Sequence, residues 1–101
     1  MSKLEKAFKI SKNLQILSKK YKGIPLPVSV KEVNKYLKKA EADFSLVKGS
    51  GYFYFASSKG KESVINRAKE TSVMVYSVTE MEIWEWLDAA QYILEDAIYQ
   101  M

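Results

Sequence analysis

The chain has 101 residues, of which 48% are hydrophobic and 28% charged, with a formal net charge of +4 and neither histidine nor cysteine. This composition fits one globular domain with a modest core and excludes a disordered chain. Because it has no histidine and no cysteine, the chain lacks the commonest general base, the usual thiol nucleophile and the common zinc ligands. It also shows no calcium loop or Walker-type phosphate loop. We expect a protein that is not an enzyme and uses no metal or cofactor.

The sequence also bears on the cell compartment. No window is apolar enough to span a bilayer, and lysines interrupt the first twenty residues where a signal peptide would have an unbroken apolar region. The absence of cysteine removes disulfides and suits a reducing environment. We therefore expect a cytoplasmic protein with no membrane partner.

Charge is distributed unevenly along the chain. Residues 1–39 hold eleven lysines against two glutamates, a net charge of +9, and residues 40–78 carry +1. Residues 79–101 hold six acidic residues and no basic one, a net charge of −6. Only the first third has the charge of a polyanion binder.

The first two expected elements are helices. Apolar residues spaced by three and four predict a helix over residues 3–21, which Gly23 and two following prolines end. Ser29 and Glu32 form a capping box before a second helix over residues 30–42. We divide the chain into a basic amphipathic N-terminal helix, residues 1–22, and an α+β core, residues 29–101, in a single domain.

Strands follow, because the apolar period changes to two. Residues 44–48 and 52–55 form a hairpin around Gly49-Ser50-Gly51, a short helix spans residues 62–69, and a third strand spans residues 72–76. The last helix begins between residues 79 and 83, with Thr79 and Glu82 as a second capping box. The predicted fold is α+β, a small three-stranded antiparallel sheet packed by helices in the order α-α-β-β-(α)-β-α.

The hairpin sequence KGSGYFYF, residues 48–55, resembles the signature strand of an RNA-binding module, whose exposed rings stack on unpaired bases. Ser50 departs from that pattern where a stacking ring is needed, and Phe53 replaces an aliphatic residue. The module's first strand would fall on residues 24–28, where two prolines remove ladder donors. We therefore favour a structural role, in which the glycines serve the turn and the aromatic rings serve the core.

A second resemblance rests on residues 49–55, on Ser72-Val73-Met74-Val75-Tyr76 and on Trp86. It is to short proteins of bacteriophages, prophages and other bacterial mobile elements, which share a glycine-rich turn into GYFYF, then SVYVY, then a helix opening just before a tryptophan. The resemblance covers roughly residues 30–95 and implies a mobile-element origin and a small α+β fold, but no activity. Met74 and Glu82 depart from the pattern, and the lysine-rich first helix looks like an addition to it.

The sheet should have two unlike faces. Alternation places Phe53 and Phe55 toward the helices and Tyr52 and Tyr54 on the opposite face. Full burial of such a ring stabilises the folded state by about 2–3 kcal/mol, so we expect the first helix or a second chain to cover the tyrosine face.

Trp84 and Trp86 cannot share one side of a helix, so one belongs to the core and the other to a surface. The candidate partner-binding residues are Tyr52, Tyr54, Met74, Tyr76 and Trp84.

The lysines of the first third are open to two interpretations. In the first, they are solvated or pair with the acidic residues of the last helix within the fold. In the second, they bind a polyanion. The absence of arginine in this part of the chain argues against bidentate phosphate recognition. The candidate polyanion-binding residues are Lys12, Lys19, Lys20, Lys35, Lys38, Lys39 and Lys48.

Two hypotheses of function follow from these surfaces. The leading one is a small non-enzymatic accessory protein of phage or mobile-element origin that binds another protein, for example a host defence or regulatory protein, with a homodimer as one form. The alternative is a sequence-tolerant nucleic-acid binder that uses the basic helices with Tyr52 and Tyr54.

Overall fold

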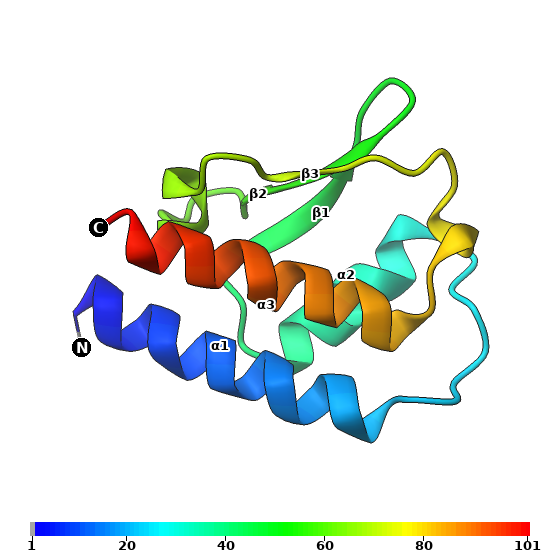
Figure 1. Cartoon of the computed structure of the whole chain (residues 1–101), viewed down its shortest axis with the longest axis horizontal. Coiled ribbons are helices and arrows are strands. Elements are labelled where there is room, and N and C mark those ends of the chain that lie inside the picture. The colour runs from blue at the N-terminus through cyan, green and yellow to red at the C-terminus, as the bar shows by residue number, and fades with distance from the viewer. Residues whose placement is uncertain (1) are drawn as a thin grey trace.

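A computed structural model describes residues 2–101 and has a three-stranded sheet on one side and helices on the other (Figure 1). The elements in chain order are α1 (Lys3–Lys20), α2 (Val30–Lys39), β1 (Phe44–Lys48), β2 (Phe53–Ser57), the 3-10 turn η1 (Val64–Arg67), β3 (Ser72–Val73), the 3-10 turn η2 (Val78–Glu80) and α3 (Ile83–Tyr99). The predicted α+β class and element order are confirmed, with the short helix of residues 62–69 reduced to the turn η1.

Helix α2 begins where the sequence predicts and ends earlier. The Ser29 hydroxyl accepts a hydrogen bond from the Glu32 N–H at 3.2 Å, as a helix cap does. At the other end Glu41 takes a positive φ of 61°, and the Ala42 N–H donates to the Leu37 carbonyl. This is a Schellman ending with glutamate in the place of the usual glycine. The prediction that α2 runs to residue 42 is therefore wrong by three residues.

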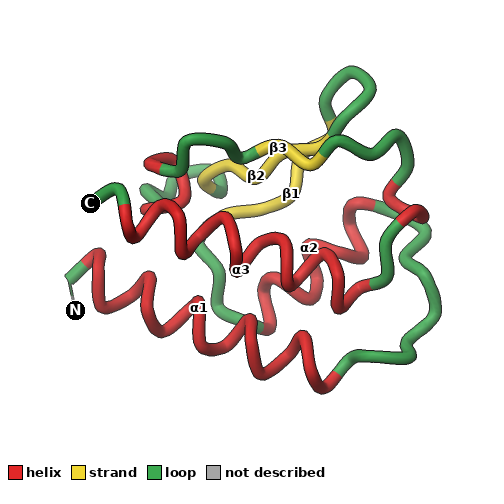
Figure 2. Tube along the Cα trace, viewed as in Figure 1, coloured by secondary structure: helices red, strands yellow, loops and turns green. Residues whose placement is uncertain are grey.

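The sheet is antiparallel in the order β1-β2-β3, with Leu46 opposite Phe55 and Phe53 opposite Val73 (Figure 2). The two glycines of the hairpin turn differ, and only Gly51 is required by its backbone conformation. Gly51 has φ of 80°, a conformation that side chains with a Cβ rarely adopt. Gly49 lies under the Tyr52 ring, so that a Cβ there would sit 2.7 Å from the Tyr52 Cζ.

The third strand is shorter than predicted, because the chain turns away after Val73. The Val75 N–H donates to the Val73 carbonyl at 3.0 Å, and the Glu80 carboxylate accepts from the N–H groups of Tyr76 and Ser77 at 2.6 and 2.7 Å. These bonds bend residues 75–77 into η2. The capping box predicted for Thr79 and Glu82 is wrong, because Ser77 and Glu80 form one before η2, and the N-cap residue of α3 is Glu82, whose N–H donates to the Glu85 carboxylate at 3.1 Å.

One core lies between the inner sheet face and the helices. Phe44 packs edge-on against Phe55, with ring centroids 5.9 Å apart, and Phe53 packs against the fully buried Trp86 at 5.5 Å. Trp86 also donates its Nε1–H to the Val78 carbonyl at 3.0 Å. The predicted division of the two tryptophans is confirmed, because Trp84 is only half-buried.

Helix α1 belongs to the same core. Its residues Ala7, Ile10 and Leu14 are buried, and it lies antiparallel along α3, on the side of α3 away from the sheet (Figure 1). The expectation that α1 covers the tyrosine face is therefore wrong, because the apolar stripe of α1 is used on α3. None of the helices within residues 2–101 combines the length and apolar character needed to cross a bilayer.

Candidate functional site

The five predicted partner-binding residues fall on two surfaces. Tyr52 and Tyr54 share the outer side of the hairpin, with ring centroids 6.0 Å apart, and the 83% exposed Tyr76 ring lies beside Gly51. Met74 and Trp84 instead line a groove between β3 and α3. The structure thus brings Tyr52 and Tyr54 together, places Tyr76 at the turn of the same hairpin, and puts the methionine and tryptophan in the groove.

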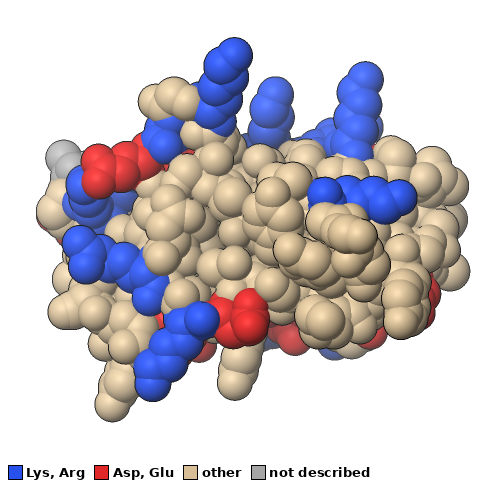
Figure 3. Space-filling model, turned by 90° about the horizontal axis from the view of Figure 1, so that it is seen from above, with Lys and Arg blue, Asp and Glu red and all other residues tan. Residues whose placement is uncertain are grey.

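The outer sheet face carries half-buried, uncharged side chains, including Val47 and Tyr54, and the helices lie on the other side of the sheet. Figure 3 looks onto this side of the molecule and shows uncharged atoms over most of the centre, with basic side chains projecting mainly around the margin. Tyr52 and Tyr54 are not fully exposed, because their rings lie over the turn and over each other.

Within residues 2–101 the ion pairs of α1 all come from its first half. Lys3 contacts Glu62 at 2.6 Å, and the hydrogen bond from its ammonium group holds the pKa of that carboxyl below its usual value. Lys6 contacts the buried Asp43 at 3.5 Å. The third pair joins Lys9 to Glu41. In this part of the chain, no lysine reaches an acidic side chain of α3 at ion-pair distance.

Two of the predicted polyanion-binding lysines stack on tyrosines. Lys39 lies 5.4 Å from the Tyr21 ring centroid and 5.1 Å from that of Tyr36, and Lys20 lies 5.6 Å from Tyr21. The two rings pack edge-on at 4.8 Å. The contacts of Lys39 and the ring pair fasten the end of α1 to the end of α2, so Lys39 has a structural use, whereas Lys20 stacks only on its neighbour in the chain.

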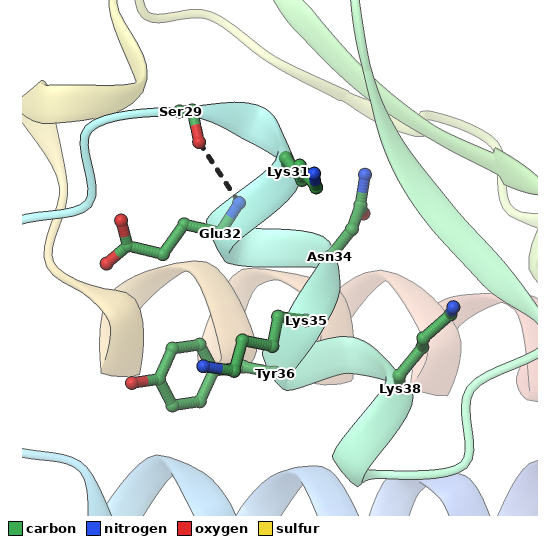
Figure 4. Close-up of a pocket in the computed structure, with 7 residues that line it drawn as sticks. All are labelled: Ser29, Lys31, Glu32, Asn34, Lys35, Tyr36 and Lys38. Atoms are coloured by element: carbon green, nitrogen blue, oxygen red, sulfur yellow. Dashed lines mark hydrogen bonds between the residues drawn. The ribbon is translucent and has the colours of Figure 1, made fainter.

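The other candidate lysines lie on three elements. Lys35 and Lys38 line a hollow of about 580 Å³ on the outer side of α2 (Figure 4), together with Ser29, Lys31, Glu32, Asn34 and Tyr36. All of these residues come from one helix and its cap, so the hollow is open surface rather than a cleft between elements. Lys12 and Lys19 are exposed on α1, and Lys48 is exposed at the end of β1.

The groove between β3 and α3 is the candidate site. It measures about 570 Å³ and has an apolar floor with an acidic rim. Its apolar residues are Val73, Met74, Met81, Trp84, Ala89, Tyr92 and Ile93, and its acidic residues are Glu70, Glu85 and Asp88. The Met74 and Tyr92 side chains stand 78% and 75% exposed, although both are large and apolar.

Trp84 is held in place at the end of this groove. Its Nε1–H donates to the Glu82 carboxylate at 2.6 Å, and the Lys22 ammonium lies 4.9 Å from its ring centroid. Ser18 of α1 donates its hydroxyl to the Trp84 carbonyl at 3.3 Å. The ring is therefore fixed before any ligand arrives, which lowers the entropic cost of binding.

Side chains form hydrogen bonds with backbone groups at both edges of the sheet. Asn34 accepts from the Leu46 N–H at 2.6 Å and donates to the Leu46 carbonyl at 3.0 Å, at the middle of β1. At β3, the Glu70 carboxylate accepts from the Ser72 N–H at 3.0 Å. Hydrogen bonds from the Ser72 side chain and backbone hold the pKa of Glu70 below its ordinary value. Strand addition is therefore hindered at both edges.

Sequence reasoning missed most of the groove. Met81, Ala89 and Ile93 lie on or before α3, and their association with β3 depends on tertiary packing. A signal for Tyr92 was present, since Tyr92 and Tyr99 lie outside the apolar stripe of the last helix. Comparison with protein-family models, with curated proteins and with solved structures found no match for this chain.

Proposed function

We propose that this chain is a small accessory protein of mobile-element origin that works by binding another protein in the groove between β3 and α3. The observation that carries the proposal is the pair of exposed side chains, Met74 and Tyr92, on either side of an apolar floor. Methionine and aromatic side chains are enriched at recognition surfaces, and an exposed cluster of them costs solvation free energy until it is covered. The origin rests on the GYFYF and SVMVY motifs and favours a host defence or regulatory protein as the partner.

The rim gives the partner's charge. Glu70, Glu85 and Asp88 surround the apolar floor, in a chain whose net charge is +4. Carboxylates at a rim favour a cationic partner, mainly through the association rate and the choice of partner. The partner segment is therefore basic on its outer side and apolar where it meets Met74 and Trp84.

The blocked edge of β3 gives the partner's form. An extended peptide that added to the sheet would need the Ser72 N–H, which already donates to Glu70. An amphipathic helix needs no backbone bond from the groove and presents apolar residues at intervals of three and four. The fitting partner is a basic amphipathic helix.

A peptide titration tests this proposal. The probe is an 18-residue Leu/Lys peptide with leucines at helical spacing, and the control is the same peptide with glutamate in place of lysine. In amide NMR spectra of the protein, the Leu/Lys peptide should shift Val73, Met74 and Ala89, and the Leu/Glu peptide should not. Ala89→Glu should weaken binding at least tenfold through bulk and a buried charge, whereas Leu26→Glu on the exposed loop should not. Equal binding of both peptides, or shifts confined to other surfaces, would refute the groove.

The alternative, sequence-tolerant nucleic-acid binding, is favoured by one observation. The outer sheet face carries Tyr52 and Tyr54 without a covering helix, and basic side chains lie around its margin (Figure 3). Aromatic rings on an open sheet can stack on bases while lysines meet phosphates. In anisotropy titrations with single- and double-stranded oligonucleotides, this function requires binding that weakens steeply with salt and falls on Tyr54→Ala. No binding at low salt eliminates it.

A further inference from the structure

A second surface, formed by α1 and α3, has features of an interface and adjoins the groove, with which it shares Asp88 and Tyr92. Each helix carries a stripe of exposed side chains, spaced by three and four residues, on this side of the molecule. The stripe of α1 is Leu4, Phe8, Lys12, Gln15 and Lys19, and that of α3 is Asp88, Tyr92, Glu95 and Tyr99. We call the two stripes together the helical face.

The helical face exposes large apolar side chains at one end. Phe8 is 55% exposed and Tyr99 is 87% exposed, although both come from well-formed helices. They border one hollow of about 260 Å³, which Ser11, Glu95 and Ile98 also line. Phe8 and Tyr99 therefore belong to one surface and do not cover each other.

The basic and acidic side chains of the helical face lie on different helices and form no ion pairs within the described residues 2–101. Lys12 and Lys19 lie on α1, whereas Asp88 and Glu95 lie on α3. Within residues 2–101 none of these four side chains forms an ion pair, because the pairs of α1 go to residues 41, 43 and 62. The face thus carries a positive half and a negative half side by side.

We propose that the helical face binds a second copy of the same chain. A two-fold axis parallel to the helices would lay α1 of each copy over α3 of the other, so that each positive half meets a negative half. That rotation leaves the position of each residue along the helix axis unchanged. Within one copy Gln91 donates to the Ser11 hydroxyl at 3.3 Å, so Lys12 stands at the level of residue 90, two residues from Asp88. By the same register Phe8 stands at the level of residue 94, next to Glu95 of the partner subunit, and Tyr99 of the partner subunit stands about 7.5 Å further along the helix axis.

The size of the helical face sets the strength of the dimer. Helices of 18 and 17 residues are about 25 Å long, and two of them packed about 9 Å apart offer roughly 500 Å² of projected face per copy. That lies near the lower bound of about 1,000 Å² in total for a specific interface. The dimer should therefore form at micromolar to tens of micromolar protein, and salt should weaken it.

A charge-swap experiment tests the dimer with the full chain. Lys12→Glu with Lys19→Glu makes α1 acidic, and Asp88→Lys with Glu95→Lys makes α3 basic. In sedimentation velocity each double variant alone should be monomeric at 100 µM, because like charges then meet. Mixing the two should restore a dimer of one copy each, which would be detected by light scattering. Lys59→Glu with Lys61→Glu, an equal charge change in an exposed loop, should leave the wild-type dimer unchanged.

Two results would overturn the proposal. One is a wild-type chain that stays monomeric at 100 µM in low salt, and the other is a dimer that both charge-swapped variants retain. Circular dichroism and thermal unfolding of each variant establish that it is folded, since all four positions are exposed. Phe8→Gln adds a check without charge change, because loss of the ring should weaken the dimer at least tenfold while a different interface would not respond.

Discussion

Asn34 illustrates how one side chain can serve two elements. It projects from α2 and binds both backbone groups of Leu46 in β1, and its neighbours on the helix, Lys31 and Lys35, line the open surface of α2. Because the carboxamide supplies both an acceptor and a donor, it replaces what a further strand would offer. No pattern in the sequence marks Asn34, since its partner depends on how α2 lies beside the sheet.

Replacing Asn34 should therefore destabilise the fold. Asn34→Ala removes two hydrogen bonds that together contribute about 1–3 kcal/mol, partly offset by the better helix propensity of alanine. We expect the free energy of unfolding to fall by about 1–2 kcal/mol, measured by urea denaturation. Lys35→Ala, one residue along the same helix, is the control. Equal stability of the two variants would contradict the role of Asn34.

The hairpin glycines give a second prediction at this scale. Gly51 adopts φ of 80°, so Gly51→Ala should cost about 1 kcal/mol of stability from the left-handed backbone alone. Thermal unfolding measures the loss, with Ser50→Ala in the same turn as the control. A Gly51→Ala protein as stable as the wild type would mean that the turn readily changes conformation. The glycines of the KGSGYFYF stretch are therefore explained by the hairpin turn.

Among the elements, helices were predicted more accurately than strands. The stripe of α1, the Ser29 cap and the alternation of β1 are local, and each was visible in the sequence. The third strand was not, because residues 72–76 alternate correctly but Glu80 draws the N–H groups of Tyr76 and Ser77 out of the sheet. The candidate site depends on that bend, and so most of it could not be predicted.

Helix α1 is a structural part of the domain, although the resemblance made it look like an addition. Leu14 is fully buried between α1 and α3, so Leu14→Ala should lower the free energy of unfolding by about 3 kcal/mol through lost burial and a cavity. Urea denaturation measures this, and Gln15→Ala on the exposed side is the control. If Leu14→Ala unfolded at the wild-type denaturant concentration, α1 would be dispensable for the core.

The edge strand β3 gives a pH prediction. Hydrogen bonds from Ser72 lower the pKa of Glu70 in the folded chain, so their stabilisation is complete above the ordinary value of 4.5 and is lost as the pH falls through the lower, folded value. The difference in stability between wild type and Glu70→Gln should therefore be larger at pH 7 than at pH 3. An NMR titration in which the Glu70 carboxyl carbon has an ordinary pKa would contradict this.

Over the whole molecule, α1 begins and α3 ends at the same end of the helical layer (Figure 1). A circular permutant that joins the two ends by a short Gly/Ser linker, with new ends between Lys59 and Gly60 in an exposed loop, should fold and unfold cooperatively. Circular dichroism through a thermal melt tests this. A permutant opened between Ala90 and Gln91, both buried in α3, is the matched case that should fail.

The side chains bonded to both sheet edges have a further consequence when many copies of the chain are present together. Fibrils grow when one exposed strand templates the next through free amide and carbonyl groups. Here the middle of one outer strand and the outward N–H of the other are already bonded to Asn34 and Glu70. Growth of a fibril from either edge of this sheet is thereby hindered.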